Sequence, residues 1–245
     1  MKTILSLVIG AALASAQLKT PSQTPPVPQS KLTPEQIGDI YMARKMFRAA
    51  ADTYRENAGN SAILWNKVGI AYHQMGDLNG AKKSYEHSLH FNGKYADAIN
   101  NLGTVYYAEK KFRGAISRYK KALTLAPNSA SIWSNLGTAY YARGKFDDMT
   151  TAYSRALQLD PDVFENHGLV GTRMMDRSVA DRARYHYEMA RMYAVSGKND
   201  LALQYLRKAL EEGFKEKEKL QAKEFSALRE TKEFQDLMAA EPRVL

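Results

Sequence analysis

Few of the side chains that can bind a metal ion or move a proton are grouped in the sequence as a site requires. Only His87 and His90, among five histidines, lie close enough in sequence to share a helix face. Two histidines do not complete a metal-ligand set, so we expect a solvated pair and no metal site. The chain has no cysteine, which excludes a disulfide framework, thiolate zinc ligands and thiol chemistry.

The motifs of common enzyme classes are also missing. The sequence contains no glycine-rich phosphate loop, no Gly-x-Ser-x-Gly and no His-Glu-x-x-His. Two acidic pairs stand at predicted helix ends. Asp147 and Asp148 suit a helix N-terminus through the helix macrodipole, and Glu211 and Glu212 are expected to be solvated. The sequence therefore predicts a protein that is not an enzyme and that uses no cofactor.

The N-terminal residues have the pattern of a secretory signal. Residues 1–16 combine one basic residue, an apolar run too short to span a membrane, and an Ala-Ser-Ala end. We expect cleavage between Ala16 and Gln17, and hence a periplasmic or secreted mature chain without a transmembrane span. The short signal is typical of a bacterial protein. Residues 17–30 hold four of the eight prolines and predict a disordered linker.

The elements that position the remaining residues are set by a repeat. Aromatic, glycine and alanine residues recur at intervals of 34 residues, and prolines mark the ends of units. We expect each unit to be an antiparallel helix pair, in which glycine and alanine make room for close packing and aromatic rings fill the space between units. The repeated positions are Trp65, Gly69, Tyr72 and Ala81, then Gly103, Tyr106, Ala115 and Pro127, then Trp133, Gly137, Tyr140 and Pro161.

This pattern resembles the tetratricopeptide-repeat family, which implies an all-α, right-handed solenoid of antiparallel helix pairs with a C-terminal helical cap. The array is expected over 31–161. Thr33 and Gln36 predict a capping box at the start of a degenerate first unit. After Pro161 we expect no second helix on schedule. The expected segments are units near 31–61, 62–95, 96–129 and 130–163, a partial helix and connector over 162–182, a further unit over 183–214, and a cap and tail over 215–245.

The resemblance also assigns residues to the concave groove in which this family binds peptides. The assigned residues are Asn66, His73, Asn100, Asn101, Thr104, Tyr107, Asn135, Thr138 and Tyr141. Asparagine is disfavoured inside helices, so its recurrence at Asn101 and Asn135 indicates either a use in holding a peptide backbone or tolerance on a wet face. The carboxylate-clamp pattern of chaperone-binding members is not matched. The asparagines are instead similar to the ladder of sugar-transferase repeat domains.

The net charge is +9, and six basic residues cluster on the turn and second helix of the expected third unit. This basic cluster could contact anionic polymers or lipids weakly, or could be a solvated surface. We expect no nucleic acid partner.

The leading hypothesis is an extracytoplasmic scaffold that binds a protein or peptide. The alternatives are an anchoring protein with a basic convex face and an accessory subunit of an envelope enzyme. The cluster comprises Lys110, Lys111, Arg113, Arg118, Lys120 and Lys121.

Overall fold

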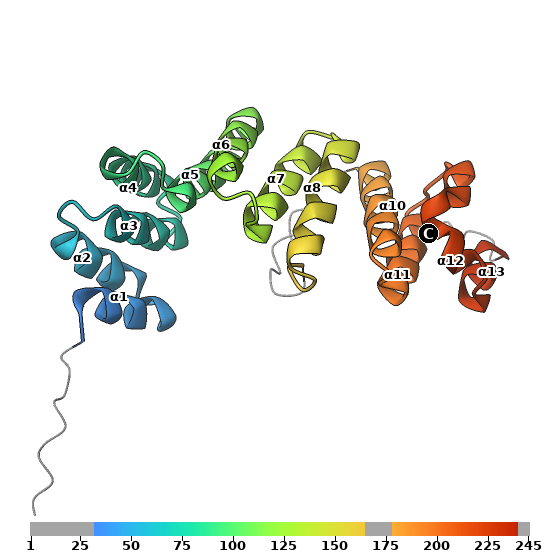
Figure 1. The fold of residues 1–245 in the computed structure, drawn as a ribbon, viewed down its shortest axis with the longest axis horizontal. Helices are drawn as coiled ribbons and strands as arrows, with labels where there is room; N and C mark the ends of the chain where they lie inside the picture. Colours follow the sequence, from blue (N-terminus) through green and yellow to red (C-terminus); the bar gives the residue numbers. More distant parts are fainter. Residues whose placement is uncertain (1–31, 165–177, 240–245) are drawn as a thin grey trace, which may run out of the picture. The chain divides into compact units, whose positions relative to one another are not determined.

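The computed structural model describes residues 32–164 and 178–239. The chain divides into two units, 1–32 and 33–245, and only Leu32 of the first unit is described. The expected signal peptide and linker therefore lie outside the described residues, as does most of the expected connector. The second unit is a succession of helices that pack in chain order (Figure 1).

Every regular element in the described residues is a helix, as expected for an all-α solenoid. The elements are α1 (Pro34–Ala43), α2 (Phe47–Asn57), α3 (Ala62–Gln74), α4 (Leu78–Phe91), α5 (Ala96–Ala108), α6 (Phe112–Leu125), α7 (Ala130–Ala142), α8 (Phe146–Leu159), α10 (Val179–Val195), α11 (Asn199–Glu211), the 3₁₀ helices η1 (Lys217–Gln221) and η2 (Lys223–Phe225), α12 (Ser226–Arg229) and α13 (Lys232–Ala239). The described helices are too short or too polar to cross a bilayer.

The helix ends follow the local sequence signals. At the start of α1, the Gln36 backbone N–H donates to Thr33 Oγ1 at 3.2 Å, and the Thr33 N–H donates to Gln36 Oε1 at 2.9 Å. This confirms the predicted capping box. Gly76 and Gly144, in the turns after α3 and α7, have φ of 77° and 70°, which suits glycine. The equivalent turn residue after α5 is Lys110, with φ of 60°.

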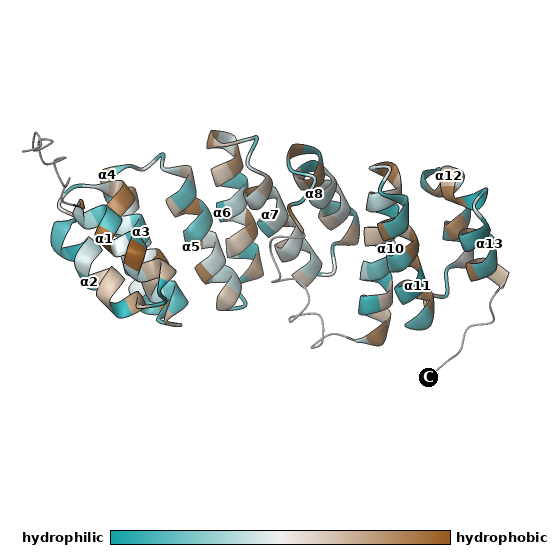
Figure 2. Ribbon diagram, turned by 90° about the horizontal axis from the view of Figure 1, so that it is seen from below, coloured by the Kyte–Doolittle hydropathy of each residue, from teal (hydrophilic) through white to brown (hydrophobic). Residues whose placement is uncertain are grey.

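The helix pairs are closed by a repeated contact between a glycine and a tyrosine. A β-carbon on Gly69 would lie 2.4 Å from Tyr85 Cε1, and one on Gly137 would lie 2.3 Å from Tyr153 Cδ1. Such distances are far inside van der Waals contact, so each tyrosine ring rests directly on the backbone of the first helix. The alternation of apolar and polar residues around each helix then leaves one side for this core and another for solvent (Figure 2).

Successive pairs are joined by antiparallel packing of a second helix on the next first helix. Where α6 meets α7, the Trp133 indole N–H donates to the Pro127 carbonyl at 2.8 Å. The Lys120 ammonium, which lies earlier on α6, is 5.8 Å from the ring centre of Tyr140, which lies later on α7. Contacts therefore run up one helix and down the other, as the predicted repeat requires.

The packing changes where α10 meets α8. The Arg184 guanidinium lies 5.7 Å from the Phe146 ring centre, and one turn farther along both helices the Thr150 hydroxyl donates to Glu188 at 3.1 Å. The contacts advance in the same direction along both chains, so α10 runs parallel to α8. In a repeat array, this is the direction expected for the second helix of the unit that follows the α7–α8 pair.

The sequence spacing of α10 agrees with that direction. Ala183, Tyr187 and Ala190 lie 34 residues after Met149, Tyr153 and Ala156, and all are buried. The expectation that no second helix follows on schedule after Pro161 is therefore wrong. The pattern was obscured because α10 also serves as the first helix of the α10–α11 pair.

The described C-terminal residues close the end of the array. Phe225, Leu228 and Phe234 are buried, and they share one hydrophobic cluster with α10 and α11. Helix α10 contacts η2, and α11 contacts α13. These short helices cover apolar residues that a further repeat would otherwise bury.

Candidate functional site

The candidate site lies on the first helices of consecutive pairs. Helix α3 contacts α5, and α5 contacts α7, so these first helices follow one another along the array (Figure 1). We call this surface the first-helix face. It carries all nine residues assigned to the peptide groove from sequence, and the structure brings most of them into one connected set.

The asparagines of this face form a ladder of hydrogen bonds across three helices. Asn135 Nδ2 donates to Asn100 Oδ1 at 3.0 Å, Asn100 Nδ2 donates to Asn101 Oδ1 at 3.2 Å, and Asn101 Nδ2 donates to Asn66 Oδ1 at 3.0 Å. Asn66 is buried, and the other three are half-buried. The amides of neighbouring first helices therefore bind one another.

An ion-pair cluster continues the face toward the N-terminus. Lys67 Nζ lies 2.6 Å from Asp39 Oδ1 and 2.8 Å from Glu35 Oε1, and the Tyr54 hydroxyl donates to Asp39 at 2.6 Å. Burial by itself would raise the pKa of Asp39, but the hydrogen bonds from Lys67 and Tyr54 outweigh it and leave that pKa lowered. The cluster therefore holds a charged carboxylate at the α1–α3 contact.

The two predicted threonines are held by their own helices. Thr104 Oγ1 donates to the Asn101 carbonyl at 2.7 Å and lies 3.4 Å from His73 Nδ1 on α3. Thr138 Oγ1 donates to the Ser134 carbonyl at 3.0 Å, and it also lies 3.0 Å from the Tyr153 hydroxyl. Thr104 therefore contacts the ladder through Asn101, whereas Thr138 links α7 to α8 through Tyr153.

The two predicted tyrosine anchors differ from each other. Tyr107 is half-buried, with its ring 5.2 Å from that of Phe112. Tyr141 is only 5 % exposed, and its ring lies 4.8 Å from that of Tyr185 on α10. Although Tyr141 was assigned to the concave groove from the sequence, its ring is covered by α10. No repeat pattern within α7 could have indicated this.

His87 and His90 of α4 are both exposed, as expected for a solvated pair, and each also contacts an aromatic ring. The His87 ring stacks on Trp65 with centres 4.6 Å apart, and His90 lies edge-on to Phe91 at 5.2 Å. The Trp65 indole N–H donates to the Gly59 carbonyl at 2.9 Å, as Trp133 does in the equivalent place. Within the described residues, no group of three or more metal-ligating side chains is found.

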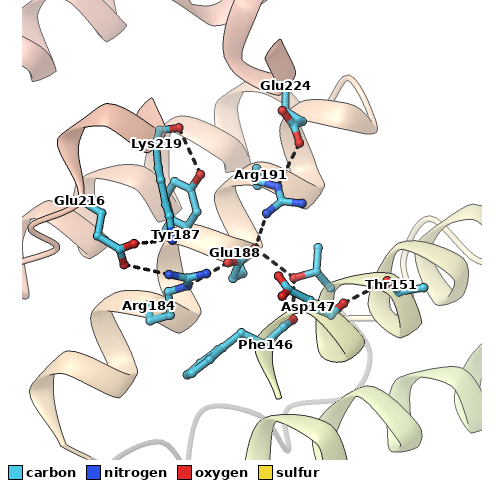
Figure 3. Close-up of polar contacts among 11 residues, drawn as sticks. Phe146, Asp147, Thr151, Arg184, Tyr187, Glu188, Arg191, Glu216, Lys219 and Glu224 are labelled. Carbon is cyan, nitrogen blue, oxygen red and sulfur yellow. Dashed lines mark hydrogen bonds and ion pairs between the residues drawn. The ribbon is translucent and has the colours of Figure 1, made fainter. Parts of the chain in front are cut away.

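Sequence reasoning missed a buried charged cluster at the α8–α10 contact (Figure 3). Glu188 is fully buried, and its carboxylate accepts from Arg184 at 2.9 Å, Arg191 at 3.0 Å and Thr150 at 3.1 Å. Arg184 and Arg191 lie about one turn before and one turn after Glu188 on α10, which was a readable signal. The burial of Glu188 was not readable, since it depends on α8.

The same arginines tie α10 to the cap. Arg184 Nη1 lies 2.8 Å from Glu216, and Arg191 Nε lies 3.2 Å from Glu224 on η2. The Tyr187 hydroxyl donates to the Lys219 carbonyl at 3.1 Å, and burial raises the pKa of Tyr187 to about 12. This cluster joins the last helices of the array to the cap, and Arg184 and Glu216 also line a hollow of about 610 Å³.

Comparisons with known proteins identify the repeats. Residues 103–144 match a family model described as TPR repeat, and residues 62–94 and 130–163 match one described as tetratricopeptide repeat. The chain therefore contains tetratricopeptide repeats, which are typical of non-catalytic interaction scaffolds. A search of curated proteins gave no significant match.

Solved structures with a similar fold include other repeat proteins. MamA 41-end from Desulfovibrio magneticus RS-1 is 20% identical with a TM-score of 0.50, covering 73% of this chain and 92% of its own. A crystal structure of MamA is 23% identical with a TM-score of 0.49, covering 72% and 94%. The first TPR of Spaghetti (RPAP3), bound to HSP90 peptide SRMEEVD, is 20% identical with a TM-score of 0.43, covering 45% and 90%.

Proposed function

We propose that this protein is an extracytoplasmic interaction scaffold that binds an extended segment of a partner protein along the first-helix face. The observation that carries the proposal is the asparagine ladder. An asparagine amide has two N–H donors, and the ladder uses one from each of Asn100, Asn101 and Asn135. The second N–H of these three half-buried residues remains to meet a backbone carbonyl of the bound segment.

The ladder also supports binding by fixing the amides in advance. A side chain that is already ordered loses less rotamer freedom when a ligand arrives, so less of the interaction energy is lost to ordering. Tyr107 lies one turn beyond Thr104 on the same helix and is the half-buried aromatic ring of the face. It supplies apolar contact area beside the polar row.

The test begins with recovery of a partner, using the mature chain as bait in an envelope extract of the source organism. Calorimetry then compares variants with the recovered segment. Tyr107→Ala is expected to weaken binding by on the order of 2 kcal/mol, as truncated aromatic anchors commonly do. Asn135→Ala, which removes the end of the ladder and so breaks a single link, is expected to weaken it less.

The matched control is charge reversal on α6. Lys120→Glu with Lys121→Glu alters two exposed residues of a second helix and should leave this affinity nearly unchanged. If the lysine changes abolish binding while Tyr107→Ala and Asn135→Ala have no effect, the first-helix face is not the site.

Export is part of the proposal and rests on residues 1–16. Sequencing the N-terminus of the secreted product should give Gln17 as the first residue, in its open or cyclised form. The proposal also includes a disordered linker over 17–30 and the unit boundaries inferred from the repeat. Recovery of the chain in the cytoplasm with Met1 still present would contradict export without bearing on the first-helix face.

A further inference from the structure

Helix α6 carries a row of positive charges without carboxylate partners. Its sequence contains Arg113, Arg118, Lys120 and Lys121, and it contains no acidic residue. None of these four cations has an ion pair with another described residue, whereas Arg55, for example, pairs with Asp52 at 2.7 Å. The charge on α6 is therefore not neutralised within the described part of the chain.

Tyrosine rings hold several of these cations in place. Arg118 and Lys82 lie 5.3 Å and 5.7 Å from the Tyr106 ring centre. Lys120 lies 5.8 Å from the Tyr140 ring centre. A ring face attracts a cation through its quadrupole but does not cancel the charge. These groups are thus positioned and still able to attract an anion.

An apolar hollow lies beside this row. It has a volume of about 350 Å³ between α6, α7 and α8. Leu123, Leu136, Trp133 and Tyr140 line it together with Lys120. Asp148 also lines it, and its carboxylate is paired with Lys145 at 3.2 Å. A basic surface that is only solvated does not require an apolar hollow. A peptide that carries both acidic and apolar side chains would use the cations and the hollow together.

We infer that the α6 surface, defined by Arg118, Lys120, Lys121 and the adjoining hollow, binds an acidic peptide segment that carries one large apolar side chain. The apolar side chain enters the hollow and contacts Trp133. The carboxylates face the lysines and Arg118, whose charges they neutralise. This site uses different residues from the first-helix face, so either can fail without the other.

The experiment measures fluorescence polarisation of labelled peptides with the full mature chain. One probe is a short Glu- and Asp-rich peptide with a single central Phe, and the second has Ala in place of that Phe. The Phe peptide should bind about tenfold more tightly than the Ala peptide and weaken as salt rises. It should also change the fluorescence of Trp133, read in a Trp65→Phe background.

Three variants separate the charge from the hollow. Lys120→Glu with Lys121→Glu should weaken the Phe peptide by about tenfold or more, while Lys94→Glu, an exposed lysine between α4 and α5, should change little. Thr151→Phe, at an exposed position lining the hollow, should remove the preference for the Phe peptide, and Thr151→Ser should retain it. Circular dichroism checks that each variant is folded.

Competition with vesicles of phosphatidylserine and with polyphosphate distinguishes other anionic partners. If either competitor displaces the peptide while Thr151→Phe has no effect, the surface is a general polyanion site and the inference is wrong. Equal binding of the two peptides, or no binding of either, also overturns it.

Discussion

The ring of Tyr119 on α6 rests against the backbone of Gly103 on α5, where a β-carbon would lie 2.6 Å from Tyr119 Cε1. The same interval in sequence separates Gly69 from Tyr85 and Gly137 from Tyr153. In the α10–α11 pair, the equivalent residues are Ala190 and Leu206, both fully buried. In this pair, alanine replaces the smaller glycine on the first helix, and leucine replaces the larger tyrosine on the second helix.

The first prediction follows from this contact. Gly103→Leu should lower the free energy of unfolding by about 1–3 kcal/mol, because the added side chain has no space beside Tyr119. Gly103→Ala should cost less, and adding Tyr119→Leu to it should cost less than the two separate changes predict. Urea denaturation measures each variant of this cycle. Strict additivity would show that the two residues do not form the packing unit.

The second prediction concerns the turn after α5. Lys110 has φ of 60°, a left-handed conformation that glycine adopts at the equivalent Gly76 and Gly144. Lys110→Gly should raise the free energy of unfolding by up to about 1 kcal/mol, because it removes the steric cost of a β-carbon there. Lys110→Ala keeps that cost and serves as the control. Equal denaturation midpoints for Gly and Ala at this position would contradict the interpretation.

The third prediction separates the two equivalent tyrosines. Tyr141→Ala should lower the free energy of unfolding by about 3–5 kcal/mol, because it empties a space enclosed by α7, α8 and α10. Tyr107→Ala should cost clearly less, since Tyr107 is half-buried. Thermal denaturation followed by circular dichroism compares them. A similar loss for both residues would mean that α10 does not cover Tyr141 in solution.

The fourth prediction concerns the buried Glu188. Glu188→Gln keeps the shape of the side chain but removes the charge that faces Arg184 and Arg191, and it should destabilise by about 1–3 kcal/mol. Thr150→Val removes one hydrogen bond to the same carboxylate and should cost less. Denaturant titration measures both. An unchanged midpoint for Glu188→Gln would show that the ion pairs add no net stability.

The fifth prediction is a dependence of stability on pH through His186. Burial lowers the pKa of His186 from its usual 6.5, and the nearby Lys208 and Arg182 act in the same direction, although Glu212 at 2.9 Å opposes them. A histidine with a lowered pKa in the folded state favours the neutral form. Its contribution is therefore complete above the unfolded pKa and is lost as pH falls from about 6.5 through the folded pKa.

His186→Gln should remove this dependence. Unfolding free energies of the wild type and the variant, measured from neutral to mildly acidic pH, should converge or cross as the wild type loses stability. The carboxylates with lowered pKa, Asp39 and Glu216, lose their contributions only in more acidic solution. Parallel curves for the two proteins would contradict the role of His186.

The sequence by itself determined the repeat register, the helix pairs and the capping box at Thr33. These features depend on local spacing: glycine admits a ring from the paired helix, and proline ends the helix before it. The nine residues of the first-helix face could also be placed on one surface, because residues at equal offsets in stacked units fall in rows. The register was lost only where α10 takes part in two helix pairs.

Only the tertiary structure decided how those rows are used. Asn135 binds Asn100 rather than the residue at its own offset, because neighbouring first helices are displaced along one another. Tyr141 is buried and Glu188 is enclosed because α10 packs directly and in parallel on α8. Burial and hydrogen-bond partners across helices depend on the distance and direction between elements, and a periodic pattern of residue types contains neither quantity.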